Sequence, residues 1–173
     1  MERRRTIRDR IVIACVLSTI AAVLFFALTS GTPIDRYQPR PPDEQQILTL
    51  IKRFHSAGQT RNLTVYSDCL SDGGQFMLGS TRMLSKDELM RALPGFWSDL
   101  ALKNAAGPVS RESMTGAWLK GDLYDPVIKI TGRTADAAVK FVVPGSRWTI
   151  VWFLGFENTR GRWQVSRSEW DMG

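Results

Sequence analysis

The chain has 173 residues, of which 43% are hydrophobic and 23% are charged, and its net charge is +6. These proportions exclude a largely disordered protein, and the length suits one globular domain plus a short extra segment. Five arginines lie within residues 1–10 and no basic run follows them, so we expect no nucleic-acid partner.

Cysteine and histidine are too few for a disulfide framework or for a zinc site of the usual kind. The two cysteines are Cys15, inside an apolar segment, and Cys69, inside the folded part, so they are not expected to pair. The single histidine is His55. We therefore predict no metal site and no cofactor.

The segment Ile11–Leu28 has neither charge nor proline and is about long enough to cross a bilayer. We predict a cytoplasmic basic tail at 1–10 and a transmembrane helix at 11–30. Because the arginines precede the helix and the next basic residue is Arg36, the positive-inside rule places the chain in the inner (cell) membrane as a single-pass protein, with its domain periplasmic or extracellular. A cleaved signal peptide is the alternative, although its apolar region is normally shorter.

A linker and three helices are predicted next. Residues 31–42 contain four prolines and indicate an extended linker, so that the domain spans 43–173. Asp43 and Gln46 resemble a helix N-cap and its partner, in a helix that ends near Gly58. A second short helix is expected from about 60 to 70.

A turn at 71–74 and a short strand at 75–78 separate these helices from a third one. Ser85 and Glu88 form a capping box at its start, and Pro94 is expected to kink or interrupt it. Strands are then predicted at 127–130, 137–143, 148–157 and 162–170, joined by short turns as an antiparallel meander. Helices followed by a meander indicate an α+β fold.

The domain resembles the nuclear transport factor 2-like superfamily, and within it the SnoaL-like proteins, over roughly residues 43–171. The resemblance rests on the segments ILTLIKRFHSAGQTRNL, CLSDGGQFML and RMLSKDELMRALPGFW, and most on DAAVKFVV and the closing hairpin TIVWFLGFENTRGRWQVSRSEW. It implies a cone-shaped curved antiparallel sheet packed on the N-terminal helices around an apolar pocket. Members include isomerases, hydrolases, cyclases and non-catalytic binding or assembly domains.

No complete catalytic set is visible. His55 follows Phe54 at the edge of the first helix's apolar face, either as a general base at a pocket mouth or as a histidine bonded to backbone or water. An isomerase of this kind also needs a buried acid and an oxyanion donor. Tyr66 could donate, but the strand at 75–78 contains no acid and Asp136 falls in a turn. We therefore predict no catalytic residues.

Alternation along the last strand places Trp163 and Val165 on the core face, with Arg167 and Glu169 continuing along it. The charged pair either orients a polar ligand or forms a salt bridge at the surface. The predicted ligand-binding residues are His55, Tyr66, Trp97, Trp152, Trp163, Arg167 and Glu169.

Both faces of the strand at 148–157 are largely apolar. One face, which includes Trp152, should build the core. The other contains Val151 and Phe153 and should be covered by a second copy of the chain, or by the third helix or the loop at 104–116.

Two functions are compatible with these features. The first is a membrane-anchored, extracytoplasmic, non-catalytic domain that binds a partner protein or a small apolar ligand, with a possible role in an envelope protein complex. The second is a tethered SnoaL-like enzyme, an isomerase, cyclase or hydrolase, acting on a small apolar substrate.

Overall fold

The computed structural model describes residues 31–39, 41–78, 83–105, 121–142 and 149–171. The predicted transmembrane helix at 11–30 lies outside these ranges. Within them, no helix is long and apolar enough to span a bilayer. Residues Pro33–Gly173 form one compact unit, to which the following description applies.

Helix α2 (Pro42–Gln59) begins where proline is tolerated best, because the N–H that Pro42 lacks would have no partner in the first turn. The predicted cap at Asp43 was wrong. The N-cap is Pro41, which makes no side-chain cap, and Asp43 lies in the first turn. The helix buries the stripe that its spacing predicted, including Ile47, Ile51 and Phe54.

Two further helices follow. Helix α3 (Leu63–Cys69) is capped by Asn62, whose Oδ1 accepts a hydrogen bond of 3.1 Å from the backbone of Val65. Helix α4 (Lys86–Ala105) begins at the predicted capping box, where the backbone N–H of Ser85 donates to Glu88 over 2.9 Å. Pro94 lies inside α4, which continues through it.

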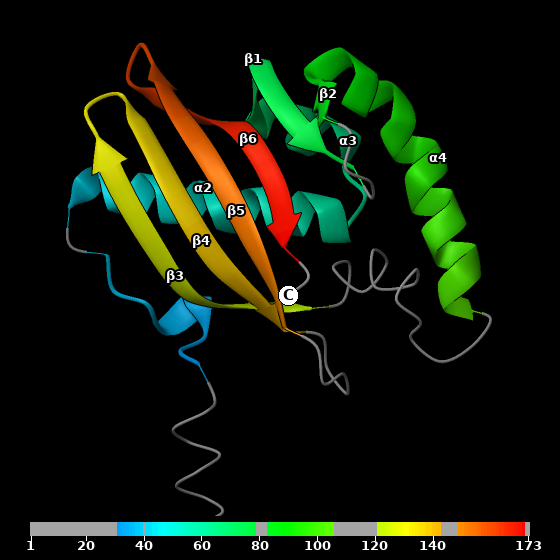
Figure 1. The fold of residues 1–173 in the computed structure, drawn as a ribbon, viewed down its shortest axis with the longest axis horizontal. Coiled ribbons are helices and arrows are strands. Elements are labelled where there is room, and N and C mark those ends of the chain that lie inside the picture. The colour runs from blue at the N-terminus through cyan, green and yellow to red at the C-terminus, as the bar shows by residue number, and fades with distance from the viewer. Residues whose placement is uncertain (1–30, 40, 79–82, 106–120, 143–148, 172–173) are drawn as a thin grey trace, which may run out of the picture. The chain divides into compact units, whose positions relative to one another are not determined.

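Six strands form one sheet in the order β2-β1-β6-β5-β4-β3 (Figure 1). The strands are β1 (Leu70–Met77), β2 (Met83–Ser85), β3 (Asp122–Thr131), β4 (Thr134–Val142), β5 (Thr149–Thr159) and β6 (Arg162–Asp171). The predicted meander is confirmed as β3 to β6, whereas β1 pairs with β6 in parallel. The turn predicted at 71–74 was wrong, because these residues continue β1 through an irregularity in its pairing with β6.

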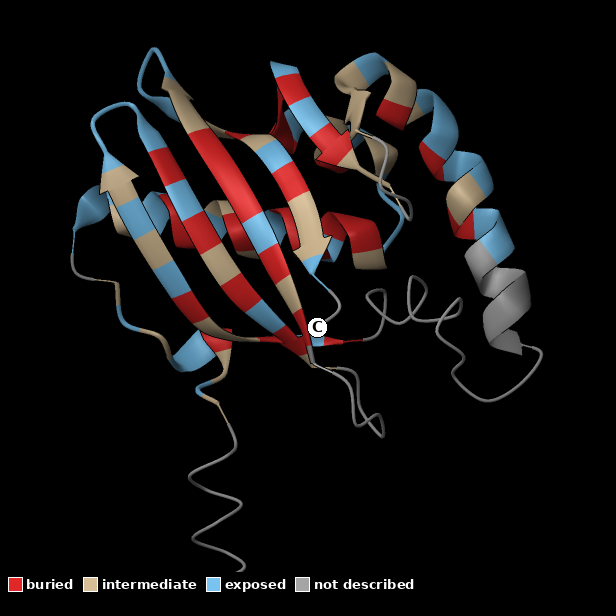
Figure 2. Ribbon diagram, in the orientation of Figure 1, coloured by how far each residue is buried: buried red, intermediate tan, exposed pale blue. Residues whose placement is uncertain are grey.

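The core lies between the sheet and α2, which crosses behind β3 to β6 in Figure 1. Alternate residues of β5 face this core, as Figure 2 shows by their burial: Ile150, Trp152, Leu154 and Phe156. The core face predicted for β5 is therefore confirmed, and Phe153 on the opposite face is 38% exposed.

A β-bulge in β6 reverses the faces predicted for its second half. Val165 pairs with Phe156, but the next pair joins Arg167 to Gly155, so Ser166 is an extra residue. Beyond it, the buried Ser168 faces the core, and Arg167 and Glu169 face outward. The expectation that Arg167 and Glu169 continue the core face was wrong for this reason.

The first half of the predicted linker (residues 31–42) packs on the domain. Residues Ile34–Arg36 form the short helix η1, Ile34 is buried in the core, and Pro33 forms a β-bridge with Tyr124 of β3. Lys52 of α2 pairs with Asp35 over 2.8 Å. The linker was expected to be extended up to residue 42, and this was wrong for residues 34–36. These residues form a short helix because the Ile34 side chain packs into the core.

Candidate functional site

The interior between α2 and the sheet is occupied by a continuous aromatic cluster. The indole rings of Trp152 and Trp170 stack at 4.9 Å with an interplanar angle of 1°. Phe54 stacks on Trp152 at 5.3 Å and contacts Tyr66 at 4.4 Å. Trp97 of α4 meets Tyr66 edge-on at 5.8 Å. The predicted site residues Tyr66, Trp97 and Trp152 thus come together, as packed core residues.

Polar atoms within this cluster are few. The indole N–H of Trp152 donates to the Ser168 hydroxyl over 2.9 Å, and both residues are buried. Burial, with a smaller contribution from the neighbouring Cys69 thiol, raises the pKa of Tyr66 far above its ordinary value. Tyr66 is therefore a neutral phenol at any physiological pH, and it faces aromatic rings instead of an acid–base partner.

His55 lies at the other end of the cluster and also reaches a separate cavity. Its ring meets Phe141 edge-on at 5.6 Å, and only 8% of the residue is exposed. The cavity, of about 400 Å³, lies between α2, η1 and the start of β3. Asp35, Asp122 and Tyr124 line it together with His55, which is the single histidine of the chain. The histidine and two carboxylate side chains therefore border the same cavity. Across the described ranges, no group of three His, Cys, Asp or Glu side chains is arranged to hold a metal ion.

Trp163 lies apart from the aromatic cluster. It is buried at the start of β6, and its indole N–H donates to Asp43 of α2 over 3.2 Å. It lines a groove of about 550 Å³ between α2 and the β5–β6 turn. Neither the contact between Trp163 and Asp43 nor this groove was predicted, because no local pattern links the two ends of the domain.

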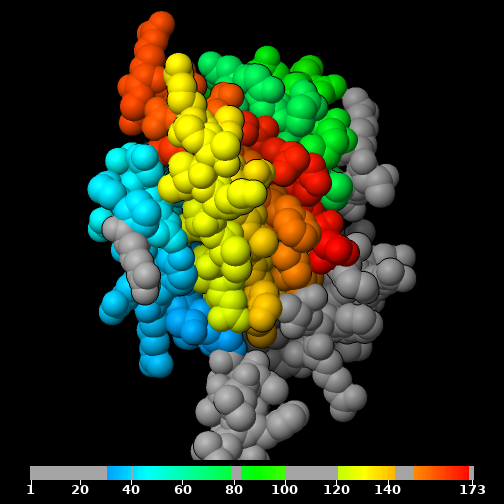
Figure 3. Space-filling view, turned by 60° about the vertical axis from the view of Figure 1, so that its left-hand side comes forward, coloured from blue at the N-terminus to red at the C-terminus, as the bar shows by residue number. Residues whose placement is uncertain are grey.

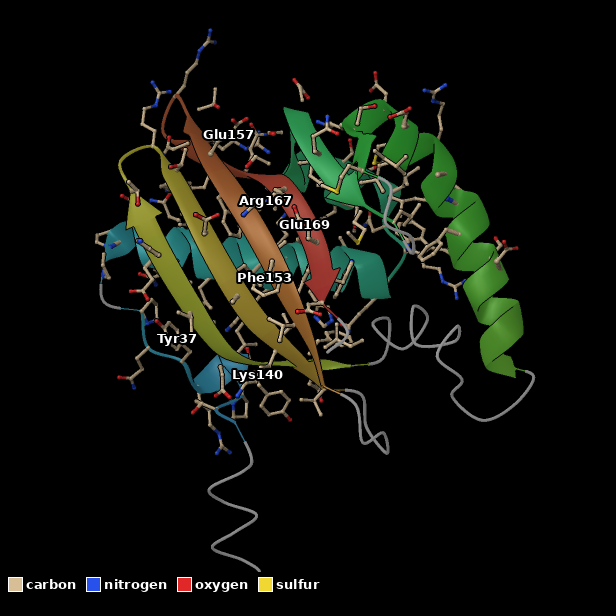
Figure 4. The ribbon with its side chains drawn as sticks, in the orientation of Figure 1. Tyr37, Lys140, Phe153, Glu157, Arg167 and Glu169 are labelled. Carbon is tan, nitrogen blue, oxygen red and sulfur yellow. The ribbon has the colours of Figure 1, made fainter. Side chains whose placement is uncertain are left out.

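Arg167 and Glu169 lie on the outer face of the sheet (Figure 4). The Arg167 guanidinium is 3.0 Å from Asp136 of β4 and 3.6 Å from Glu169. It crosses β5 at Gly155, where a Cβ atom would lie 3.0 Å from the Cβ of Arg167. The predicted pair therefore exists as a half-exposed ion-pair network, which matches the surface alternative.

A row of apolar side chains crosses this outer face beside the network. Cross-strand pairing aligns Val127 with Ala138 and Ala138 with Phe153. Val127 and Phe153 are 67% and 38% exposed. Strands β3 to β6 lie side by side in Figures 1 and 3. Val127 was not predicted as part of this surface, because its face depends on the bulge between Tyr124 and Val127 in β3.

Comparisons with known proteins bear on the fold alone. No family model matches the chain, and no curated protein matches it significantly. A nuclear transport factor 2-like protein from Cytophaga hutchinsonii matches in structure with a TM-score of 0.53 and 14% identity, over 78% of this chain and 100% of that one. One from Novosphingobium aromaticivorans, described as having a cystatin-like fold, gives 0.52 and 16% over 90% and 89%. One of unknown function from Pseudomonas putida gives 0.52 and 15% over 73% and 84%. The fold is thus nuclear transport factor 2-like, as the resemblance implied.

Proposed function

We propose that this protein is a membrane-anchored, extracytoplasmic, non-catalytic binding or assembly domain that works as a homodimer. The observation that carries the proposal is the contrast between the two sheet faces. The inner face is filled by stacked aromatic rings, and the outer face presents an exposed apolar row.

The filled interior argues against a substrate site in the cone. Trp152, Phe54 and Phe141 are fully buried, and the rings from Trp97 to Trp170 contact one another in series. An acid–base site needs a titratable group that faces the reacting atoms. Tyr66 is kept neutral here by burial, and its ring neighbours are Phe54 and Trp97.

The outer face suits a second copy of the same chain. The apolar row of Val127, Ala138 and Phe153 lies between two ion pairs of mixed sign, Arg167 with Asp136 and Lys140 with Asp125. A two-fold axis through the row would bring basic groups of one copy near acidic groups of the other, as an isologous interface requires. Anchoring both copies in one membrane would favour the dimer further, because it raises their effective concentration.

Sedimentation of the full chain in detergent tests the dimer. Phe153→Glu should convert a dimer into a monomer, because it places an unpaired carboxylate in the apolar row. Thr64→Glu, on an exposed turn of α3, adds the same charge elsewhere and should leave the dimer intact. A monomeric wild-type chain at high concentration would remove the homodimer from the proposal, and a partner of another kind would then have to cover Phe153.

One observation favours the alternative, a tethered SnoaL-like enzyme acting on a small apolar substrate. His55 shares its 400 Å³ cavity with Asp122 and Tyr124, and a histidine near a carboxylate is a common acid–base arrangement. If the protein is this enzyme, any activity found should disappear in His55→Gln while the melting temperature is retained. Activity that survives His55→Gln would exclude this cavity as the site.

A further inference from the structure

The groove beside Trp163 is built from three elements and has a different character at each end. One stripe of α2 forms its first wall, and the β5–β6 turn with Asp68 of α3 forms the second. The α2 stripe consists of Pro42, Gln45, Gln46, Thr49, Leu50 and Arg53. Because these positions follow the helical repeat, their side chains lie in line along the groove.

The end at Arg53 is basic. Arg53 lies 3.5 Å from the Asp68 carboxylate, and Arg162 donates to the Asp68 carbonyl oxygen over 2.9 Å. Each guanidinium has five N–H donors. Neither makes another hydrogen bond or ion pair to any residue that the structure describes, so most of these donors remain available. Asp68 thus holds two cations in place and offsets the charge of only one.

Both guanidiniums lie at the end of α3, because each contacts Asp68. The neighbouring Cys69 thiol agrees with this placement. Burial raises its pKa, Arg53 and Arg162 act against this by lowering it, and Asp68 raises it. Two arginines with free N–H groups in such an arrangement are well suited to a carboxylate, which each can bind through two parallel hydrogen bonds.

The rest of the groove is apolar and then polar. Leu50, which is half-buried, supplies apolar surface beside Arg53, and Gln45 and Gln46 lie nearer the start of α2. Trp163 also lines the groove, but its indole donates to Asp43 in the first turn of α2 and only 5% of the residue is exposed. Neither glutamine side chain is hydrogen-bonded within the described part of the chain, so both amides can donate to and accept from a ligand backbone. The acidic first turn of α2, with Asp43 and Glu44, disfavours a second carboxylate at this end.

We infer that the groove binds an extended peptide segment of a partner protein, with an acidic side chain seated between Arg53 and Arg162. The α2 stripe from Pro42 to Arg53 spans about 16 Å at 1.5 Å per residue. An extended peptide advances about 3.3 Å per residue, so about five residues fill this length. The site deepens the proposed binding role but shares none of its lining residues with the outer sheet face.

The test uses the full chain in detergent and an array of acetylated, amidated pentapeptides that carry one Glu at each position in turn, beside a matched array with Gln. Binding should require Glu, should favour it at one end of the peptide, and should weaken as salt is added. Arg162→Gln and Arg53→Gln should each lower affinity at least about tenfold, the loss expected for a charge-assisted contact. Arg162→Lys should recover only part of the loss, since Lys cannot bind a carboxylate through a planar fork.

Two control variants separate recognition from net charge and from folding. Arg91→Gln removes the same charge from an exposed position on α4 and should leave binding unchanged. Asp68→Asn removes the carboxylate that competes for Arg53 and should tighten binding, a gain that a purely structural role would not produce. Equal binding of the Glu and Gln arrays, equal losses in Arg91→Gln and Arg162→Gln, or weaker binding by Asp68→Asn would each overturn the inference. Phe153→Glu should leave peptide binding intact, so failure of the dimer and failure of the groove remain distinguishable.

Discussion

Trp152 of β5 and Trp170 of β6 stack with their ring planes parallel to within 1° and their centroids 4.9 Å apart. The two residues are cross-strand partners, and the bulge at Ser166 is what brings Trp170 to the core face. One extra residue therefore decides whether the end of β6 contributes an aromatic ring or a charged pair to the interior.

Replacing Trp152 should have the largest effect on stability. We expect Trp152→Ala to lower the free energy of unfolding by about 3–5 kcal/mol, because it removes a fully buried side chain that stacks on both Phe54 and Trp170. Trp152→Phe should cost less, since it keeps one ring in the stack. Urea denaturation of the full chain measures both, and wild-type stability of Trp152→Ala would contradict the packing described for the inner face.

Ser168→Ala should cost about 1–3 kcal/mol although it removes only one oxygen atom. Its hydroxyl accepts the 2.9 Å hydrogen bond from the Trp152 indole, and without it the buried N–H has no acceptor. Ser67→Ala, a change of the same size on half-buried α3, serves as the control. Comparable small losses in the two variants would mean that the indole finds another partner.

Stability should fall as the pH rises above about 8. Burial raises the pKa of Cys69 above its ordinary value of 9.0, so at alkaline pH the unfolded chain releases a proton that the folded chain retains. The stabilising effect is complete below the ordinary thiol pKa and is lost above it. Cys69→Ser replaces the thiol by a hydroxyl that can donate to the Val65 carbonyl oxygen, as the thiol does over 3.1 Å. The variant therefore keeps the hydrogen bond and removes the titrating thiol.

Urea midpoints of the wild type and Cys69→Ser between pH 7.5 and 9.5 measure this difference. The decline should be shallower in the variant over this range, which lies below the ordinary Tyr66 pKa of 10.0. Parallel declines in the two proteins would assign the alkaline destabilisation to other groups.

Ile34→Ala should lower the free energy of unfolding by about 2 kcal/mol, at the low end for a buried isoleucine, since it removes the anchor of η1 from the core. The neighbouring variant Asp35→Ala should cost less than about 1 kcal/mol, because its ion pair with Lys52 is exposed. If both variants lose equally little, residues 33–37 do not stabilise the domain.

The proposed anchor predicts the topology of the whole chain. A reporter enzyme that folds only outside the cytoplasm, fused after Gly173, should be active, and the purified protein should retain the arginines within residues 1–10. Mass spectrometry of the membrane fraction gives the N-terminus directly. A soluble form that begins near Ser30 would instead establish a cleaved signal peptide.

Much of the fold could be predicted because its signals are local. The apolar stripe of α2, the capping box of Ser85 and Glu88 and the alternation along β5 each depend on neighbouring residues. The predictions failed where a distant element decides the outcome. Residues 71–74 resemble a turn but continue a strand because β6 lies beside them.

In the candidate site, too, the predictions held where local sequence decides and failed where distant residues decide. Tyr66 was chosen as a possible hydrogen-bond donor, and Trp97 and Trp152 as apolar residues of the helix stripe and the inner sheet face. The three do lie together. Arg167 and Glu169 were placed on the wrong face, because strict alternation contains no information about the extra residue Ser166. The groove between Arg53 and Arg162 joins positions more than a hundred residues apart in sequence, which periodicity does not connect.

The position of β6 in the sheet also governs how the domain can be made. It is the last of the described strands in sequence, yet it lies between β1 and β5, and among these strands it alone joins β1–β2 to β3–β5. During translation, β3 to β5 can pair as they emerge, while β1 and β2 must wait for residues 162–171 to leave the ribosome. Until then, the Trp152 ring lacks its two partners from β6, the stacked Trp170 ring and the Ser168 hydroxyl. Chains interrupted before Arg162 should therefore expose Trp152 and become substrates of chaperones and proteases.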